Sequence, residues 1–533
     1  MKDERKNEFI EIFKRRDGLK LNGDDLRHEG FLDESDDRDL QFMWMAYIQS
    51  LDLSQEKISD EGIMALLENV SLMHVEELIL PENEIGSELL DIIAKNNKWE
   101  KLKKLSIANS TINAELIVQA FSKMPKLKLE ELNLSKNNIG DPGVELILGN
   151  KALSILNKLS LQNSNISCKG IIALVNDRKR SDLKVLNLSE NNIGEEGAHH
   201  LACHRYWEML KELYLSNCSI GHEGGIKLAS NDTWACLRVL DLSGNEIGIK
   251  SVTALVEYDT WRKLEIVNLS NNKITDEGGR VIGRNKSWSY LRELYLANNQ
   301  IEDNGAGSIE VNETWTKIDI LCLKKNRIKQ NAFPQALKRI IRDTSPQSKF
   351  IKICYNIGRC WQNVKKLDLS MNEIVDETAI AIGSNASWKN LEVLDLSHNF
   401  IGDKGALAIG YNDSWKTLKK LNLEKNKITG VGISSFGKNE TWICLEELVL
   451  SQNSISDEGA EYIGNNANWI NLKILSLHSN DIGDLGSIAI GRNTSWINLE
   501  ELNLSSNKIG DAGSKMIGSN TTWRKLKKTL FKE

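Results

Sequence analysis

The side chains best suited to chemistry lie in one short stretch that holds His199, His200, Cys203 and His204. On a helix, His200 would share a face with Cys203 and His204, three and four residues further on. Imidazole and thiolate groups are ligands for zinc and related transition metals. Three ligands on one short helix do not complete a site, and Cys218, which could add a fourth, falls at an inward position of a repeat. We therefore expect no resident metal, with His200, Cys203 and His204 as the candidates if one binds.

A second stretch, residues 432–439, comes within one residue of the phosphate-binding loop G-x-x-x-x-G-K-[ST]. Asn439 stands where that loop needs a magnesium-binding hydroxyl. The same glycine spacing recurs at residues 405–410 and 486–491, so it belongs to a repeated helix. We expect no bound nucleotide and no other cofactor.

Eight Asn-x-Ser/Thr sequences precede tryptophans and would be glycosylation acceptors in a secreted protein. They begin at Asn231, Asn285, Asn312, Asn385, Asn412, Asn439, Asn493 and Asn520. Each follows the repeated helix in a fixed register, so a single kind of turn explains all eight.

The elements that must position these residues follow one pattern, L-x-L-x-x-N-x-I. Its first leucine, a valine at 267, recurs every 27 residues from Leu51 to Leu321 and, after one step of 46, from Leu367 to Leu502. This gives seventeen repeats, with the closing isoleucine in all of them and the asparagine in thirteen. Repetition with one period indicates a stacked array in place of several ordinary domains.

Each repeat should combine a short strand with a short helix. The alternation in L-x-L marks a strand with one buried face, and stacking builds a parallel sheet with a continuous leucine core. The asparagine amide can satisfy backbone groups in the turn after the strand, so the asparagines should form a ladder. In the second half, as in residues 402–415, an acidic residue and a closing glycine and asparagine are capping signals for a helix.

A helix is wider than a strand, so the stack should curve with its helices outside. The predicted fold class is α/β: a solenoid in the form of a horseshoe, with a parallel sheet on the concave face and short helices on the convex face. These motifs resemble leucine-rich repeat proteins, most closely the ribonuclease-inhibitor-like class, over about residues 46–531. The resemblance implies that the concave sheet and its flanking loops bind another protein.

Thirteen of the 14 tryptophans lie six residues before the first leucine of a strand. They are Trp99, Trp207, Trp234, Trp261, Trp288, Trp315, Trp361, Trp388, Trp415, Trp442, Trp469, Trp496 and Trp523. Aromatic rings that stack on a ligand are one interpretation. A position that recurs once per repeat, just after the helix, favours a buried packing spine instead.

The period also divides the chain. Residues 1–45 should hold a capping helix and a degenerate first repeat, residues 46–328 repeats 1–11, and residues 367–533 repeats 12–17 with the C-terminal end. Residues 329–366 exceed the period and are either an irregular, shortened repeat or a functional insertion. Both interpretations stay open.

Composition limits the partners and the compartment. The 533 residues are 41% apolar and 27% charged, with a net charge of -6 and no basic stripe, so neither nucleic acid nor an anionic membrane is an expected partner. No signal peptide and no run of about 18 apolar residues is visible. Eight scattered cysteines indicate reduced thiols. We expect a cytoplasmic protein, in a host cytosol if the source is an intracellular bacterium.

Strand residues on either side of the leucines should point to the concave face. Most are small or polar, but repeats 7 to 11 carry two tyrosines, roughly 15 Å apart at about 4.8 Å per strand, among acidic and apolar neighbours. Such groups are typical of interface hot spots. The predicted patch comprises Glu212, Tyr214, Asp241, Ile266, Asn268, Glu293 and Tyr295. The competing interpretation is a solvated sheet surface without a partner.

The sequence contains no nucleophile beside a base, no paired carboxylates outside the repeat and no metalloprotease helix, so we expect no enzyme and no small-molecule substrate. The predicted function is a non-catalytic scaffold or sensor that binds another protein through its concave face. Two alternatives remain: a regulator of an enzyme, either an inhibitor of a hydrolase or an activator of a small GTPase, and a structural or surface protein.

Overall fold

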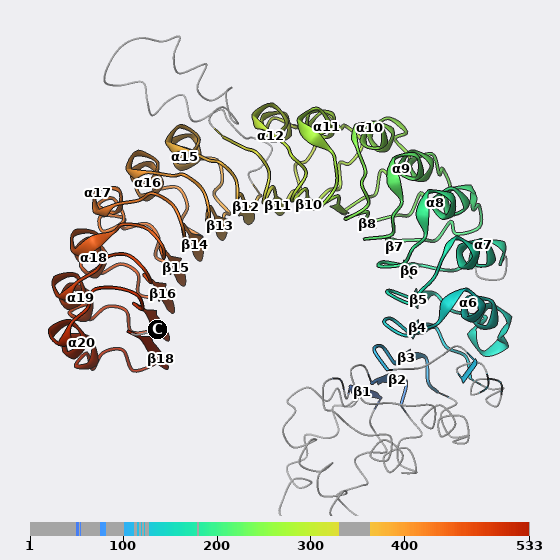
Figure 1. Ribbon diagram of the computed structural model, residues 1–533, viewed down its shortest axis with the longest axis horizontal. Coiled ribbons are helices and arrows are strands. Elements are labelled where there is room, and N and C mark those ends of the chain that lie inside the picture. The colour runs from blue at the N-terminus through green and yellow to red at the C-terminus, as the bar shows by residue number, and fades with distance from the viewer. Residues whose placement is uncertain are drawn as a thin grey trace, which may run out of the picture. The chain divides into compact units, whose positions relative to one another are not determined.

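The computed structural model describes residues 49–52, 54, 75–80, 101–110, 115, 116, 119, 122, 127–177, 181–329 and 363–531. The chain divides into two compact units, Met1–Asn245 and Glu246–Glu533. In each unit, parallel strands line one face and helices cover the opposite face (Figure 1). The predicted α/β solenoid is thus confirmed within each unit. The capping helix and degenerate repeat predicted for residues 1–45 lie outside the described residues.

The first unit contains eight described strands of three residues each. They are β1 Ser50–Asp52, β2 Glu77–Ile79, β3 Lys104–Ser106, β4 Glu131–Asn133, β5 Lys158–Ser160, β6 Val185–Asn187, β7 Glu212–Tyr214 and β8 Val239–Asp241. The described helices are α6 Gly140–Gly149, α7 Cys168–Asn176, α8 Gly194–Cys203 and α9 Gly221–Ala229, with a 3₁₀ turn at Lys151–Leu153. Neighbouring strands pair with equivalent residues opposite each other, as Leu213 and Leu240 do.

The second unit repeats this arrangement with ten described strands. They are β9 Ile266–Asn268, β10 Glu293–Tyr295, β11 Ile320–Cys322, β12 Lys366–Asp368, β13 Val393–Asp395, β14 Lys420–Asn422, β15 Glu447–Val449, β16 Ile474–Ser476, β17 Glu501–Asn503 and β18 Lys528–Leu530. Its described helices are α10 Ile249–Glu257, α11 Thr275–Gly283, α12 Asp303–Glu310, α15 Asp376–Gly383, α16 Asp403–Gly410, α17 Gly430–Ile433, α18 Ser456–Gly464, α19 Asp484–Gly491 and α20 Asp511–Gly518.

Each strand from β1 to β17 is centred on the first leucine of the motif or on Val267, whereas β18 is centred on Thr529. In β10, the fully buried Leu294 lies between the half-buried Glu293 and Tyr295, and the second leucine, Leu296, is buried just after the strand. The first leucine, or the valine at 267, is at most 2% exposed in every repeat. Full burial of such a side chain stabilises the fold by roughly 1.5–3 kcal/mol, so this column forms the core of each unit.

The asparagine of the motif joins successive repeats, as predicted. The Oδ1 atom of Asn299 accepts hydrogen bonds from the backbone N–H groups of Asn272 (3.2 Å) and Ile274 (3.4 Å) in the preceding repeat. Its Nδ2 atom donates to the carbonyl oxygen of Leu269 at 2.8 Å. Because the turn is buried, these bonds satisfy backbone groups that water cannot reach.

The acidic residue lies in the first turn of the helix, as expected, and it also links this helix to the next one. Asp403 is the first residue of α16, and the N-cap residue before it, Gly402, has no side chain to cap the helix. Its Oδ1 atom accepts from the backbone N–H groups of Thr429 (2.8 Å) and Gly432 (3.1 Å) at the start of α17. The carboxylate therefore links repeats, and the Gly432 amide of the loop-like stretch 432–439 is already bonded.

The tryptophan position forms the predicted packing spine. The described tryptophans of this column are at most 4% exposed. Trp496 is stacked between Trp469 and Trp523, with ring centroids 6.5 and 6.1 Å apart and the planes nearly parallel. These rings contact their neighbours in the stack and present no face to a ligand. Trp99 and Trp361 lie outside the described residues.

The asparagine three residues before most of these tryptophans has the predicted role in a turn. The Nδ2 atom of Asn493 donates to the carbonyl oxygens of Gly464 (2.8 Å) and Asn466 (2.9 Å). Its Oδ1 atom accepts from the backbone N–H groups of Ser495 and Trp496. This amide is buried and fully bonded, so in the folded protein it is closed to glycosylation.

The 46-residue step does not interrupt the sheet of the second unit. Strand β11 pairs directly with β12 in the register of the other strands. The asparagine ladder continues as well, because Asn372 Oδ1 accepts from the backbone N–H of Asn326 at 3.1 Å. The structure tests neither interpretation of residues 329–366, because residues 330–362 lie outside the described residues.

None of the helices in the described ranges has the length and apolar character needed to cross a membrane.

Candidate functional site

The two residues that flank the buried leucine of each strand form the exposed surface of the sheet. In β7 and β10 the sequence of the strand is the same, Glu-Leu-Tyr. In both strands the glutamate and the tyrosine are half-buried and lie on the same face, because side chains two residues apart on a strand point the same way. The strand therefore brings an acid and a phenol into contact.

In the first unit, the hydroxyl of Tyr214 donates a hydrogen bond of 2.8 Å to Oε2 of Glu212. The strands on either side place β-branched apolar residues, Val185 and Val239, opposite Glu212. They also place Asn187 and Asp241 opposite Tyr214. The sequence-based patch omitted Val185, which the pairing register adds.

In the second unit, the hydroxyl of Tyr295 donates to Oε2 of Glu293 at 2.7 Å. Glu293 again has β-branched apolar residues opposite it, Ile266 and Ile320. Tyr295 lies opposite two small residues, as the next strands carry Asn268 and Cys322 there. The same surface motif is thus built once in each unit, and we call Tyr214–Glu212 and Tyr295–Glu293 the tyrosine–glutamate pairs.

Burial and the neighbouring glutamates keep both phenols neutral. Burial is the main cause that raises the pKa of Tyr214 above its ordinary value, followed by the hydrogen bond to Glu212 and the charge of that carboxylate. The pKa of Tyr295 is raised for the same reasons, with Glu293 as the partner. Each hydroxyl therefore remains a donor to its glutamate, and the ring is held in one orientation.

Elsewhere on the sheet surface, the equivalent charges neutralise one another. Glu131 lies between Lys104 and Lys158, at 3.6 and 3.1 Å, and Lys420 pairs with Glu447 at 2.7 Å. Among the described residues, neither Glu212 nor Glu293 forms an ion pair. Each tyrosine–glutamate pair therefore leaves a negative charge between apolar side chains, an arrangement suited to bind a basic group.

The seven predicted patch residues are divided between the two units. Glu212, Tyr214 and Asp241 come together on β7 and β8 of the first unit. Ile266, Asn268, Glu293 and Tyr295 come together on β9 and β10 of the second unit. The tyrosine–glutamate hydrogen bonds were not predicted, although the repeated Glu-Leu-Tyr sequence was a signal for them.

The three candidate metal ligands point to different surroundings. His204 is 3% exposed, and its ring centroid lies 4.0 Å from that of Trp207. Burial lowers the pKa of His204 to about 4, so this imidazole is a neutral packing group. Cys203 is exposed and lies 3.8 Å from Nε2 of His199.

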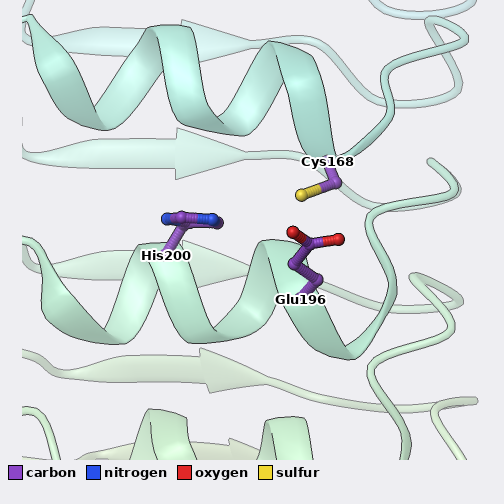
Figure 2. A group of neighbouring side chains, drawn as sticks. All are labelled: Cys168, Glu196 and His200. Atoms are coloured by element: carbon purple, nitrogen blue, oxygen red, sulfur yellow. The ribbon is translucent and has the colours of Figure 1, made fainter.

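His200 faces the neighbouring helix instead. Among the described residues, one group of three metal-capable side chains has ligand atoms within 4.8 Å of one another: Cys168, Glu196 and His200. Figure 2 shows Cys168 at the start of one helix, close to the Glu196 carboxylate, with His200 further along the helix that carries Glu196. The sequence candidates Cys203 and His204 do not belong to this group.

A family model described as Leucine Rich repeat matches thirteen segments, which together make up more than half of the chain. The segments are 45–67, 126–148, 181–202, 208–229, 235–256, 262–283, 289–309, 362–383, 389–410, 416–437, 443–464, 470–491 and 497–518. The chain belongs to the leucine-rich repeat family. Proteins of this family typically recognise other proteins, so membership supports a binding role.

Solved structures agree with this fold. A leucine-rich repeat protein of Leptospira interrogans is 21% identical, with a TM-score of 0.50 over 84% of this chain and 99% of its own. An internalin of Listeria monocytogenes is 19% identical, with a TM-score of 0.42 over 89% of this chain and 94% of its own. At such identities the likeness concerns the fold alone. No curated protein sequence matches this leucine-rich repeat chain significantly.

Proposed function

We propose that this leucine-rich repeat protein is a non-catalytic scaffold or sensor that binds a partner protein through the concave, strand-lined face of its repeats. The tyrosine–glutamate pairs form the centres of the binding surface. The observation that carries the proposal is their duplication: the same acid, phenol and flanking β-branched residues occur on β7 of one unit and β10 of the other.

Each tyrosine–glutamate pair has the properties of an interface anchor. Tyrosines are enriched among residues that dominate binding energy, because one ring offers a large apolar area and a polar end. The hydrogen bonds of 2.8 and 2.7 Å to Glu212 and Glu293 fix the rings before a partner arrives. A side chain that is already ordered loses less entropy on binding.

The surroundings of the pairs indicate the chemistry of the partner. Glu293 forms no ion pair with any described residue and lies between Ile266 and Ile320. A basic side chain that reaches this carboxylate would form a charge-assisted hydrogen bond, and its stem would cover the isoleucines. We therefore propose a partner surface that presents lysine or arginine together with apolar groups.

We also propose a cytosolic location and membership of the ribonuclease-inhibitor-like class. The six described cysteines, Cys168, Cys203, Cys218, Cys236, Cys322 and Cys444, are all free thiols, in keeping with a reducing compartment. Most described repeats carry a convex α-helix of eight to ten residues, in keeping with that class.

The test compares two double variants with the same change in composition. Tyr214→Ala with Tyr295→Ala removes both anchors, and Tyr258→Ala with Tyr411→Ala removes two tyrosines, 54% and 60% exposed, that follow helices α10 and α16. A partner is first captured from native lysate with the wild-type chain and identified. Its affinity for each variant is then measured by calorimetry.

We expect the first double variant to bind at least about tenfold more weakly, and the control to bind like the wild type. Both variants should keep the wild-type circular dichroism spectrum, because all four tyrosines are at least partly exposed. Wild-type affinity in the Tyr214/Tyr295 variant, or an equal loss in the control, would contradict the assignment of the binding surface.

A further inference from the structure

The cluster of Cys168, Glu196 and His200 lies on the helical face of the first unit, away from the strand surface assigned to protein binding. A sulfur, a carboxylate oxygen and an imidazole nitrogen come within 4.8 Å of one another there. Cys168 and His200 are half-buried and Glu196 is exposed, so the site is open to ions in solution and partly enclosed by protein.

Two successive helices hold the three side chains in place. Glu196 and His200 are four residues apart on α8, which puts them on the same face of that helix. Cys168 is the first residue of α7, in the preceding repeat. Figure 2 shows the sulfur of Cys168 directed from the start of α7 toward the α8 face that carries Glu196 and His200.

Cys168 lies at a position that holds an aspartate in many of the described repeats. One repeat earlier, the position of Cys168 is occupied by Asp141, whose Oδ1 atom accepts from the backbone N–H groups of Ser167 (2.8 Å) and Gly170 (2.9 Å). A thiol cannot take over the role of that charged acceptor. The chain lacks this aspartate at Cys168, as it also does at His222, Ile249 and Gly430, and the residue that replaces it at 168 faces Glu196 and His200.

The position of His200 varies among the repeats. Equivalent helix positions hold small residues such as Ala173 and Ala254 as well as large ones such as Lys227 and Tyr462. The reason to look for a ligand is therefore the meeting of a thiol, a carboxylate and an imidazole at one place.

We propose that Cys168, Glu196 and His200 bind one zinc ion. Thiolate, imidazole and carboxylate are the three protein ligand types that zinc takes, and a tetrahedral ion leaves a fourth position for water. Oxygen-preferring ions such as magnesium and calcium do not match a set with sulfur and nitrogen donors. The bound ion would tie α7 to α8 at the point where the aspartate link of other repeats is missing.

The proposed zinc ligands differ from the three metal ligands suggested by the sequence, so variants can distinguish the two sets. Both sets contain His200, whereas the helix-face set would add Cys203 and His204. Cys203 contacts His199 and His204 is buried against Trp207, so neither replaces Cys168 or Glu196. Variants at Cys168 and Cys203 therefore separate the two assignments.

The experiment uses the full chain without a histidine tag, stripped of metal, and titrates it with Co²⁺ and then with Zn²⁺. Thiolate bound to Co²⁺ gives a sulfur-to-metal charge-transfer absorption that bound carboxylate or imidazole alone does not give. We expect one equivalent of Co²⁺ with this absorption, displaced by one equivalent of Zn²⁺. Cys168→Ser should abolish the absorption, and His200→Ala should weaken binding at least about tenfold.

Matched controls come from the same helix. Cys203→Ser and His199→Ala, both at exposed positions of α8, should keep the wild-type absorption and affinity. Circular dichroism of the metal-free variants checks that each one folds. Loss of the absorption in Cys203→Ser with its retention in Cys168→Ser, or titration of the wild type without any such absorption, would overturn the proposal. The partner-binding variants play no part in this result, so the two proposals fail independently.

Discussion

Replacement of Trp496 by alanine should lower the free energy of unfolding by about 3–5 kcal/mol. The ring is fully buried and stacked between Trp469 and Trp523, and its Nε1 atom donates to the carbonyl oxygen of Asn466 at 3.2 Å. The substitution would leave a cavity bordered by two other rings and remove that hydrogen bond. Since repeats are stabilised by their neighbours, the C-terminal repeats should unfold before the rest.

Urea unfolding followed by circular dichroism measures this loss, and hydrogen exchange locates it. The adjacent Ile497 is 54% exposed, so Ile497→Ala is the matched control and should change the unfolding free energy by no more than about 0.5 kcal/mol. If Trp496→Ala were as stable as the control, the tryptophan column would not be a packing spine, and a ligand-stacking role would have to be reconsidered.

Replacement of Glu310 by glutamine should remove a pH-dependent loss of stability. Glu310 ends α12 and is 3% exposed, and no hydrogen-bond partner of its Oε2 atom is present in the described part of the chain. Burial raises the pKa of this carboxyl to about 8. The equivalent position is a glycine in several other repeats, such as Gly464, where a Cβ would lie only 2.6 Å from the backbone carbon of Ala489.

The direction of this pH dependence follows from proton binding. Above about pH 4.5 the unfolded chain loses the Glu310 proton, whereas the folded chain keeps it until about pH 8. The contribution of Glu310 to the free energy of unfolding is therefore fully present at low pH. It falls by up to about 1.4 kcal/mol per pH unit between about pH 4.5 and pH 8. By pH 8 the loss reaches roughly 4 kcal/mol, and Glu310→Gln should be free of it.

Unfolding free energies of the wild type and of Glu310→Gln at pH 5, 6.5 and 8 test this expectation, because other titrating groups cancel in the difference. The stability advantage of the variant should grow steadily with pH. Glu313→Gln, at an exposed position three residues further on, is the control and should follow the wild type. A difference that stays constant with pH would show that Glu310 is solvated or paired in the folded state.

Sequence reasoning predicted most of the fold because one physical rule acts seventeen times. At the positions of Leu294, Asn299 and Trp496, most of the described repeats make the same contact with a neighbouring repeat, so periodicity alone identifies the strand core, the ladder and the spine. The turn around Asn493 was predictable as well, because its Asn-x-Ser sequence recurs at a fixed position of the repeat.

Contacts specific to one repeat were beyond that reasoning. The link made by Asp403 recurs in several repeats, but its direction depends on the offset between successive helices, which the period does not reveal. The meeting of Cys168 with His200 joins residues 32 apart, a spacing that no motif marks. His204 carries the residue type of a metal ligand, but its burial against Trp207 depends on how the end of α8 turns inward.

The most direct test of concave-face recognition is site-specific photo-cross-linking with the captured partner. A benzophenone side chain is placed at Val239 and at Ile320, next to the tyrosine–glutamate pairs, and, as controls, at the exposed helix positions Lys169 and Lys250. We predict that irradiation joins the partner to the chain from Val239 or Ile320 and from neither lysine position. Cross-linking from Lys169 or Lys250 alone, with none from the strand positions, would contradict the account.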